Sequence, residues 1–122
     1  MSVGFPTDLH LDVFGCVVEA AYNAKPYLVG SAAAGKGWRD VDVVVLIPER
    51  RFAKRFGSYG PPFSAIPRWA AECMAWSALG EKMTGLPIDF KVQPIEWAND
   101  HHDGPRHALT ITGPVVAARL AP

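Results

Sequence analysis

The stretch over residues 27–48, YLVGSAAAGKGWRDVDVVVLIP, constrains the fold more than any other part of the chain. A short apolar run at 27–29 meets a glycine-rich segment, and a continuous apolar run at 43–47 follows and stops at Pro48. Short runs rich in β-branched residues and bounded by glycine and proline are typical of strands. A run without polar interruption is typical of a strand covered on both faces. The stretch therefore predicts two strands joined by a glycine-rich loop.

Asp40 and Asp42 stand at the head of the second predicted strand. Because strand residues alternate between faces, positions two apart point the same way and hold the two carboxylates side by side. Like charges repel at short range, and a hard divalent cation with oxygen ligands is the usual reason to build such a pair. The loop before them opens with Gly30 and Ser31 and offers backbone N–H groups to an anion. Carboxylates for a metal beside a cradle for phosphate are the parts that nucleotidyl transfer requires.

The rest of the chain predicts a small α/β (α+β) domain that occupies residues 1–122. We expect helices at 7–23, 49–56, 69–83 and 95–100, one helical turn at 31–34, further strands at 88–93 and 109–112, a loop at 57–62, a polar turn at 101–105 and a frayed tail from about 113. The link between the strand of Asp42 and the strand of Asp89 contains a helix. This order predicts a mixed sheet with the helices packed mainly on one face.

Composition narrows the class of protein. At 122 residues, with 49% hydrophobic and 20% charged residues, the chain has room for one packed domain and is not expected to be disordered. The formal net charge is zero, which gives no overall attraction to nucleic acid or to a membrane surface. Cys16 and Cys73 are far apart and are expected to be buried, reduced thiols. The longest apolar run is too short to cross a bilayer, so we expect a cytoplasmic protein with no membrane partner.

One local motif suggests a different phosphate site. Residues 30–36 fit GxxxxGK, the core of a P-loop, but Gly37 follows where a P-loop has Ser or Thr to hold magnesium. A P-loop also continues into a helix of several turns, whereas here the chain reaches the strand of Asp42 within about five residues. The context therefore argues against a P-loop.

A second set of motifs fits better. It comprises a Gly-Ser turn after a strand, a glycine in the loop, Asp-x-Asp at the head of a hydrophobic strand and a lone aspartate on a later strand. In this chain these are Gly30-Ser31, Gly35, Asp40-Val41-Asp42 and Asp89. Together they resemble the DNA polymerase β-like nucleotidyltransferase superfamily, and above all its small single-domain members. The resemblance covers residues 27–92, and it departs from the pattern at Arg39, where a serine is expected directly before the first aspartate.

The resemblance implies a role for each position. Gly30, Ser31, Gly35 and Lys36 would bind the triphosphate of the nucleotide. Asp40, Asp42 and Asp89 would be the catalytic residues and would hold Mg²⁺ or Mn²⁺. The implied reaction moves a nucleoside monophosphate from a triphosphate such as ATP to a hydroxyl of an unknown acceptor. Small members of the superfamily often work with a separate helical protein, and RNA is a further acceptor that we consider.

The residues leave other interpretations open. Asp40 would also suit the start of a turn, and Asp89 would suit a solvent-facing position on an edge strand. Ser31 would also suit a helix N-cap that binds no ligand. A catalytically degenerate fold that only binds a nucleotide or a partner is the alternative function, favoured by the short loop and by Arg39. A third interpretation, an RNA-binding module, depends on the basic cluster Arg50, Arg51, Lys54 and Arg55.

Several aromatic and polar residues have two interpretations each. Trp69 and Trp76 are expected in the core, whereas Trp38 is the better candidate for stacking on a base. Lys91 is expected either to pair with Asp89 or to contact a phosphate. The histidines at 101 and 102 are expected to be solvated rather than zinc ligands. Nothing in the sequence shows whether Arg106 reaches back to the site.

Overall fold

A mixed sheet with strand order β3-β2-β1-β4 organises the molecule. The computed structural model describes residues 7–30, 40–57 and 62–109. Their strands are β1 (Pro26–Val29), β2 (Val41–Ile47), β3 (Ile88–Pro94) and β4 (His107–Ala108). β2 is parallel to β3, and β1 is antiparallel to both β2 and β4. The predicted mixed sheet in a small α/β fold is confirmed.

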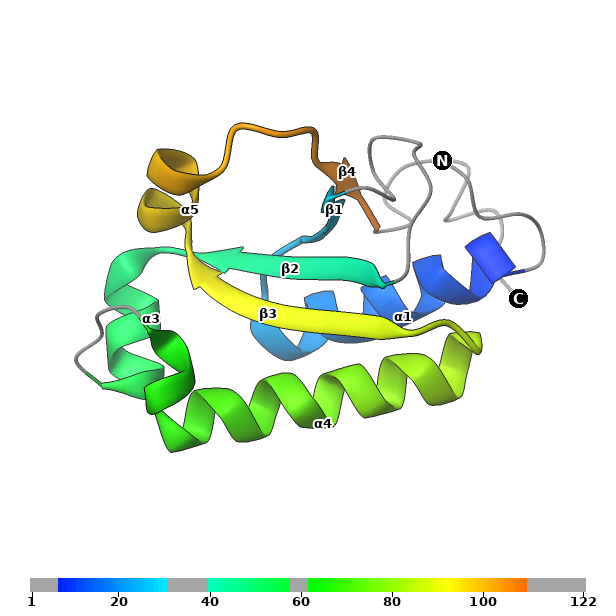
Figure 1. The fold of residues 1–122 in the computed structure, drawn as a ribbon, viewed down its shortest axis with the longest axis horizontal. Helices are drawn as coiled ribbons and strands as arrows, with labels where there is room; N and C mark the ends of the chain where they lie inside the picture. Colours follow the sequence, from blue (N-terminus) through cyan, green and yellow to red (C-terminus); the bar gives the residue numbers. More distant parts are fainter. Residues whose placement is uncertain (1–6, 31–39, 58–61, 110–122) are drawn as a thin grey trace.

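The two long helices lie together on one face of the sheet (Figure 1). They are α1 (Thr7–Tyr22) and α4 (Pro67–Thr84), as the predicted one-sided packing requires. The shorter α3 (Glu49–Phe56) and a 3₁₀ turn (Phe63–Ala65) lie beside the end of β2, and α5 (Ile95–His101) lies on the opposite face. No helix in the described part of the chain is long and apolar enough to cross a membrane.

The core lies between the sheet and the two long helices. One face of β2 contributes Val41, Val43, Val45 and Ile47, all nearly inaccessible to solvent. An aromatic cluster packs against this face, with ring centroids 6.0–6.5 Å apart: Phe14, Tyr22, Trp76 and Phe90. Trp69 is also buried, and its Nε1 donates a hydrogen bond to the carbonyl of Val92 at 2.7 Å. Both tryptophans therefore belong to the core, as predicted.

The ends of the long helices follow from local chemistry. α1 stops where Asn23 adopts a left-handed φ of 51°, a conformation common just after a helix. The guanidinium of Arg51 donates to the carbonyls of Tyr22 and Asn23, which a helix end leaves without partners. α4 begins at a proline and ends before Gly85, which has a φ of 74° and donates its N–H to the carbonyl of Glu81.

The C-terminal strand differs from the prediction. The expected strand at 109–112 is wrong at its start, because the pairing with β1 uses His107 and Ala108 instead. Leu109 is fully buried beyond the strand, and its N–H still bonds the carbonyl of Pro26. The hydrogen bond of Leu109 therefore extends the contact with β1 to the last described residue. The rest of that predicted strand, the helical turn at 31–34, loop residues 58–61 and the tail lie outside the described residues.

The two cysteines are unpaired thiols, as expected. Cys73 is buried on α4, and burial raises the pKa of its thiol to about 11. Cys16 is only half-buried, so for this residue the expectation of full burial is wrong. A protonated, buried thiol is a poor nucleophile, and Cys73 serves as a small core side chain.

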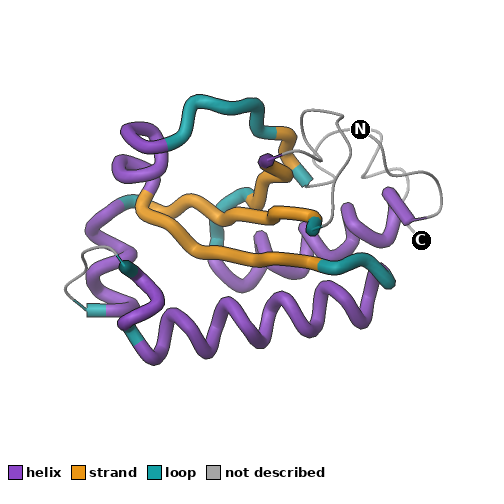
Figure 2. The backbone as a smooth tube through the Cα atoms, viewed as in Figure 1, coloured by secondary structure: helices purple, strands orange, loops and turns teal. Residues whose placement is uncertain are grey.

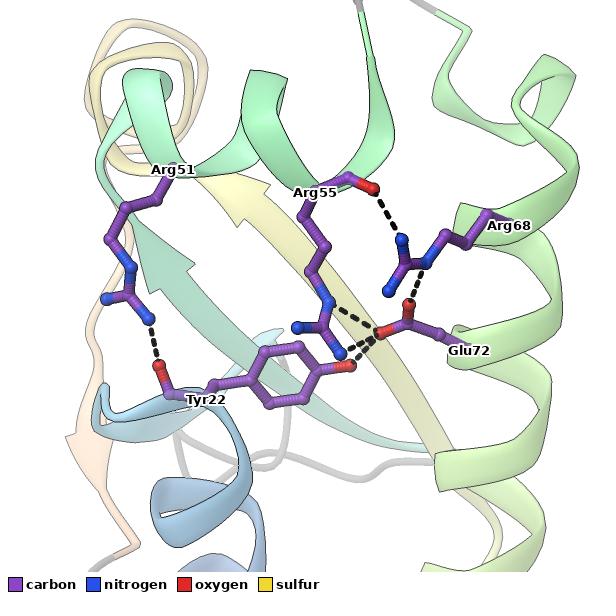
Figure 3. Close-up of polar contacts among 5 residues, drawn as sticks. All are labelled: Tyr22, Arg51, Arg55, Arg68 and Glu72. Carbon is purple, nitrogen blue, oxygen red and sulfur yellow. Dashed lines mark hydrogen bonds and ion pairs between the residues drawn. The ribbon is translucent and has the colours of Figure 1, made fainter.

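A polar network ties α1, α3 and α4 together at one edge of the core (Figure 3). The carboxylate of Glu72 accepts hydrogen bonds from the hydroxyl of Tyr22 at 2.7 Å and from Nε of Arg55 at 2.9 Å. Nε of Arg68, one turn earlier on α4, donates to its other oxygen at 3.0 Å. Burial alone would raise the pKa of Glu72, but these three donors outweigh it and lower the pKa below its usual value.

Glu72→Gln tests this network. A carboxylate with a lowered folded-state pKa contributes stability above its unfolded-state pKa, which is lost as pH falls through the folded-state pKa. We expect the variant to lose about 2 kcal/mol of unfolding free energy at pH 7, and to approach the wild type below about pH 4. Urea titrations between pH 3 and pH 8 measure this difference. Glu81→Gln, at an exposed position of the same helix, is the control, and an equal loss in both variants would contradict the network.

Candidate functional site

The sheet face opposite α1 and α4 is only partly covered. β2 presents Asp42, Val44 and Leu46 on this face, alternating with its core residues. Val44 and Leu46 pack against Ala98 of α5 and are buried. Asp42, at the start of the strand, is only half-buried. The carboxylate therefore lies at the end of this face that α5 leaves open.

Asp42 and Asp89 are direct neighbours on adjacent strands. The parallel register of β2 and β3 pairs these two residues, and both line the same cavity. Lys91 follows two residues after Asp89 on the same face of β3, and its Nζ lies 2.9 Å from Oδ2 of Asp89. The side chains of Asp89 and Lys91 are each 43% exposed. Of the two roles expected for Lys91, the ion pair with Asp89 is confirmed.

The ionised form of Asp42 is disfavoured in this environment. Burial raises the pKa of Asp42 above its usual value, and the charges of Asp89 and Asp40 add to the effect. The ammonium of Lys91 acts in the opposite direction and lowers the pKa. A cation placed between these carboxylates would relieve their repulsion, and partial burial would strengthen the attraction.

Gly30 closes the cavity beside Asp42. This glycine follows β1, has a φ of 73°, and is placed so that a Cβ atom would lie 2.5 Å from Oδ2 of Asp42. Any other residue would be strained in the backbone and would force the carboxylate to turn away. Glycine therefore lets the end of β1 and the acid of β2 occupy adjacent positions.

The carboxylates face a cavity of about 390 Å³. Its floor is the open sheet face, and its far wall is the end of α5 with the segment that leads to β4. Figure 2 shows this segment as a loop that arches from α5 back to the opposite edge of the sheet. The far wall comprises His101, His102, Asp103, Gly104, Pro105 and Arg106.

The sequence did not indicate that this segment lines the cavity of the two carboxylates. The polar turn was predicted, but nothing local to it indicates that it lies across from Asp42 and Asp89. Arg106 lines the cavity, which answers the question that the sequence left open. The only usable signal was the turn's composition, with two histidines and an arginine close together, a pattern that is equally common on solvated surfaces.

The structure places the predicted site residues in different positions. Gly30, Asp42 and Asp89 are brought together at the cavity. Asp40 is exposed, precedes β2, and lines a separate groove between β3 and α4 that Asp89 also borders. Ser31, Gly35 and Lys36 lie outside the described residues, as does Trp38. Over residues 7–30, 40–57 and 62–109, no three His, Cys, Asp or Glu side chains are grouped to hold a metal.

The basic cluster on α3 is largely used within the fold. Arg51 caps α1, and Arg55 binds Glu72 and lies 4.8 Å from the ring centroid of Tyr22. Arg50 and Lys54 are exposed. Two exposed charges, one helical turn apart, are a weak basis for a nucleic-acid surface.

Comparisons with protein families, with curated proteins and with solved structures find no match to this chain. The assignment of a function therefore depends on the geometry of the site.

Asp42→Asn tests the electrostatics of the pair. A carboxyl group whose folded-state pKa is raised contributes stability below its unfolded-state pKa of about 3.9, and this stability is lost as pH rises through the folded-state pKa. We expect the variant to melt a few degrees above the wild type at pH 7 without divalent cations, with the difference vanishing near pH 3. Melting curves across that range, with Asp100→Asn as the exposed control, measure it. Equal melting temperatures at pH 7 would show that Asp42 is not under strain.

Gly30→Ala tests the contact between the end of β1 and Asp42. The positive φ alone should cost about 1 kcal/mol of unfolding free energy. A further cost should appear only while the carboxylate of residue 42 is present, because Oδ2 is the atom that the new methyl group meets. Denaturant titrations of the variant in the wild-type and Asp42→Ala backgrounds separate the two costs. The same loss in both backgrounds would mean that the carboxylate is not held against Gly30.

Proposed function

We propose that this protein is a divalent-metal-dependent nucleotidyltransferase that moves a nucleoside monophosphate from a triphosphate such as ATP to a hydroxyl. The observation that carries the proposal is the register of β2 and β3. It sets Asp42 directly beside Asp89, on the open face of the sheet and at a cavity of about 390 Å³. A cavity of this size is in the range of small-molecule sites.

The two carboxylates suit Mg²⁺ or Mn²⁺. Both are only partly buried, lie on adjacent strands and present oxygen ligands to one cavity. Proteins commonly hold Mg²⁺ through one or two carboxylates, with substrate phosphates and waters as the other ligands, so a pair is sufficient. A bound ion would neutralise the charge that develops on the leaving pyrophosphate. Asp40, in the neighbouring groove, strengthens the negative field at Asp42.

In this proposal the triphosphate binds beside the end of β1. Gly30 brings the backbone at the end of β1 close to Asp42, so a phosphate bound at this chain end would lie near the carboxylate. Lys91 balances Asp89 while no cation is bound. Once a cation takes over that balance, the ammonium is available to a phosphate oxygen. These features support a site that binds metal and triphosphate together.

The alternative is a degenerate fold that binds a nucleotide or a partner without turnover. It is favoured by the separation of Asp40 from the cavity that holds Asp42 and Asp89. The RNA-binding module is less well supported, because Arg51 and Arg55 are engaged within the fold. A helical protein partner, an RNA acceptor and a cytoplasmic location stay predictions.

Asp42→Asn also tests the proposed function. We expect wild-type protein to bind Mn²⁺, followed by electron paramagnetic resonance, and to melt higher with Mg²⁺ and a non-hydrolysable triphosphate, because ligands of the native state stabilise it. The variant should lose both effects, and pyrophosphate release from ribonucleoside triphosphates should fall by at least about 10³-fold. Asp100→Asn, an exposed aspartate of α5 that does not line the cavity, is the matched control.

Two results discriminate the interpretations. Binding of metal and nucleotide without pyrophosphate release by wild-type protein, with all four ribonucleoside triphosphates and a range of hydroxyl acceptors, favours the degenerate binder. No Mn²⁺ binding by wild-type protein contradicts the metal site and, with it, the enzyme.

A further inference from the structure

We propose that the far wall of the cavity is an acceptor subsite, which takes a small phosphate ester carrying a free hydroxyl through Arg106 and His101. The proposal names the substrate class of the transferase proposed above and depends on that function for its biological meaning. The subsite uses different residues from the proposed metal site. Arg106 and His101 come from the segment after β3, whereas the carboxylates lie on the strands.

Arg106 is an anchored cation that faces the cavity. Its Nη1 donates to Oδ1 of Asn99 at 2.9 Å and its Nη2 to the carbonyl of His102 at 3.4 Å, so neutral oxygens fix the guanidinium. Among the described residues Arg106 forms no ion pair. A half-buried guanidinium held by neutral acceptors keeps its charge and several N–H donors for an anion. Phosphate matches that fork of donors.

His101 offers a hydrogen-bond acceptor on the same wall of the cavity as Arg106. Its Nδ1 lies 2.8 Å from the carbonyl of Trp97, and since a carbonyl only accepts, Nδ1 carries the proton. In the neutral ring Nε2 is then the acceptor. The ring stacks on the indole of Trp97, with centroids 4.4 Å apart and planes at 16°, which fixes its orientation. An oriented acceptor near an anchored cation suits a hydroxyl on a molecule whose phosphate binds Arg106.

The charged residues around the cavity are consistent with Arg106 binding the phosphate and His101 binding the hydroxyl. Three carboxylates line the cavity, those of Asp42, Asp89 and Asp103, together with two cations. Lys91 is paired with Asp89, which leaves Arg106 as the cation available to an incoming anion. Asp103, on the same wall, carries the same charge as phosphate and weakens its binding.

The test uses ribose 5-phosphate as the probe and histidine-labelled protein, followed by nuclear magnetic resonance in EDTA. We expect a saturable shift of the His101 ring signals in wild-type protein. In Arg106→Gln the dissociation constant should rise about tenfold, whereas Arg50→Gln, which removes an exposed arginine outside the cavity, should leave it unchanged. His101→Gln, followed through the ring signals of His102 at the same cavity, should show no preference for ribose 5-phosphate over inorganic phosphate. Circular dichroism confirms that each variant is folded.

Three results overturn the proposal: no saturable shift in wild-type protein, equal affinity in Arg106→Gln and Arg50→Gln, or wild-type affinity for inorganic phosphate equal to that for ribose 5-phosphate. Because EDTA removes divalent metal, the result is independent of the metal site. Failure here together with Mn²⁺ binding at Asp42 leaves the transferase standing without this subsite. Success here without Mn²⁺ binding leaves a phosphate-ester site in a protein that is not a metal-dependent transferase.

Discussion

The parallel pairing of β2 with β3 is the constraint on which the site depends. The register that sets Asp42 beside Asp89 also sets Val43 beside Phe90 and Val45 beside Val92 in the core. A slip by one residue would move the apolar set to the open face and the acids into the core. The burial of these apolar side chains therefore holds two like charges together, although the charges themselves oppose the arrangement.

The repulsion between Asp42 and Asp89 lowers the stability of the native state, and other parts of the fold offset this loss. The raised pKa of Asp42 means that its ionised form destabilises the native state at neutral pH. The aromatic cluster on the opposite sheet face contributes apolar burial, and the lowered pKa of Glu72 means that its network stabilises the same state. Strain at one place and well-satisfied contacts elsewhere are typical of a binding site set into a stable scaffold.

The helices and strands could be predicted from the sequence because individual residues mark where they end. Pro48 and Pro94 mark the ends of strands, and Gly85 the end of α4. The far wall could not be predicted, since it reaches the cavity through β4, a two-residue strand whose pairing is not local. The partners of Arg51 were equally hidden, because main-chain carbonyls at a helix end have no sequence signature. Asp40 precedes the first paired residue of β2, so strand alternation does not govern it.

The length of α5 explains why a cavity exists at all. Its seven residues span about 10 Å, whereas the seven residues of β2 span about 23 Å. A helix of that length that starts directly after β3 covers Val44 and Leu46 but cannot reach Asp42. The chain then returns to the far edge of the sheet as a loop (Figure 2), and residues of this loop line the cavity that the carboxylates also line. The carboxylates are thus fixed on rigid strands, and the residues facing them sit on a loop, where sequence changes are tolerated most easily.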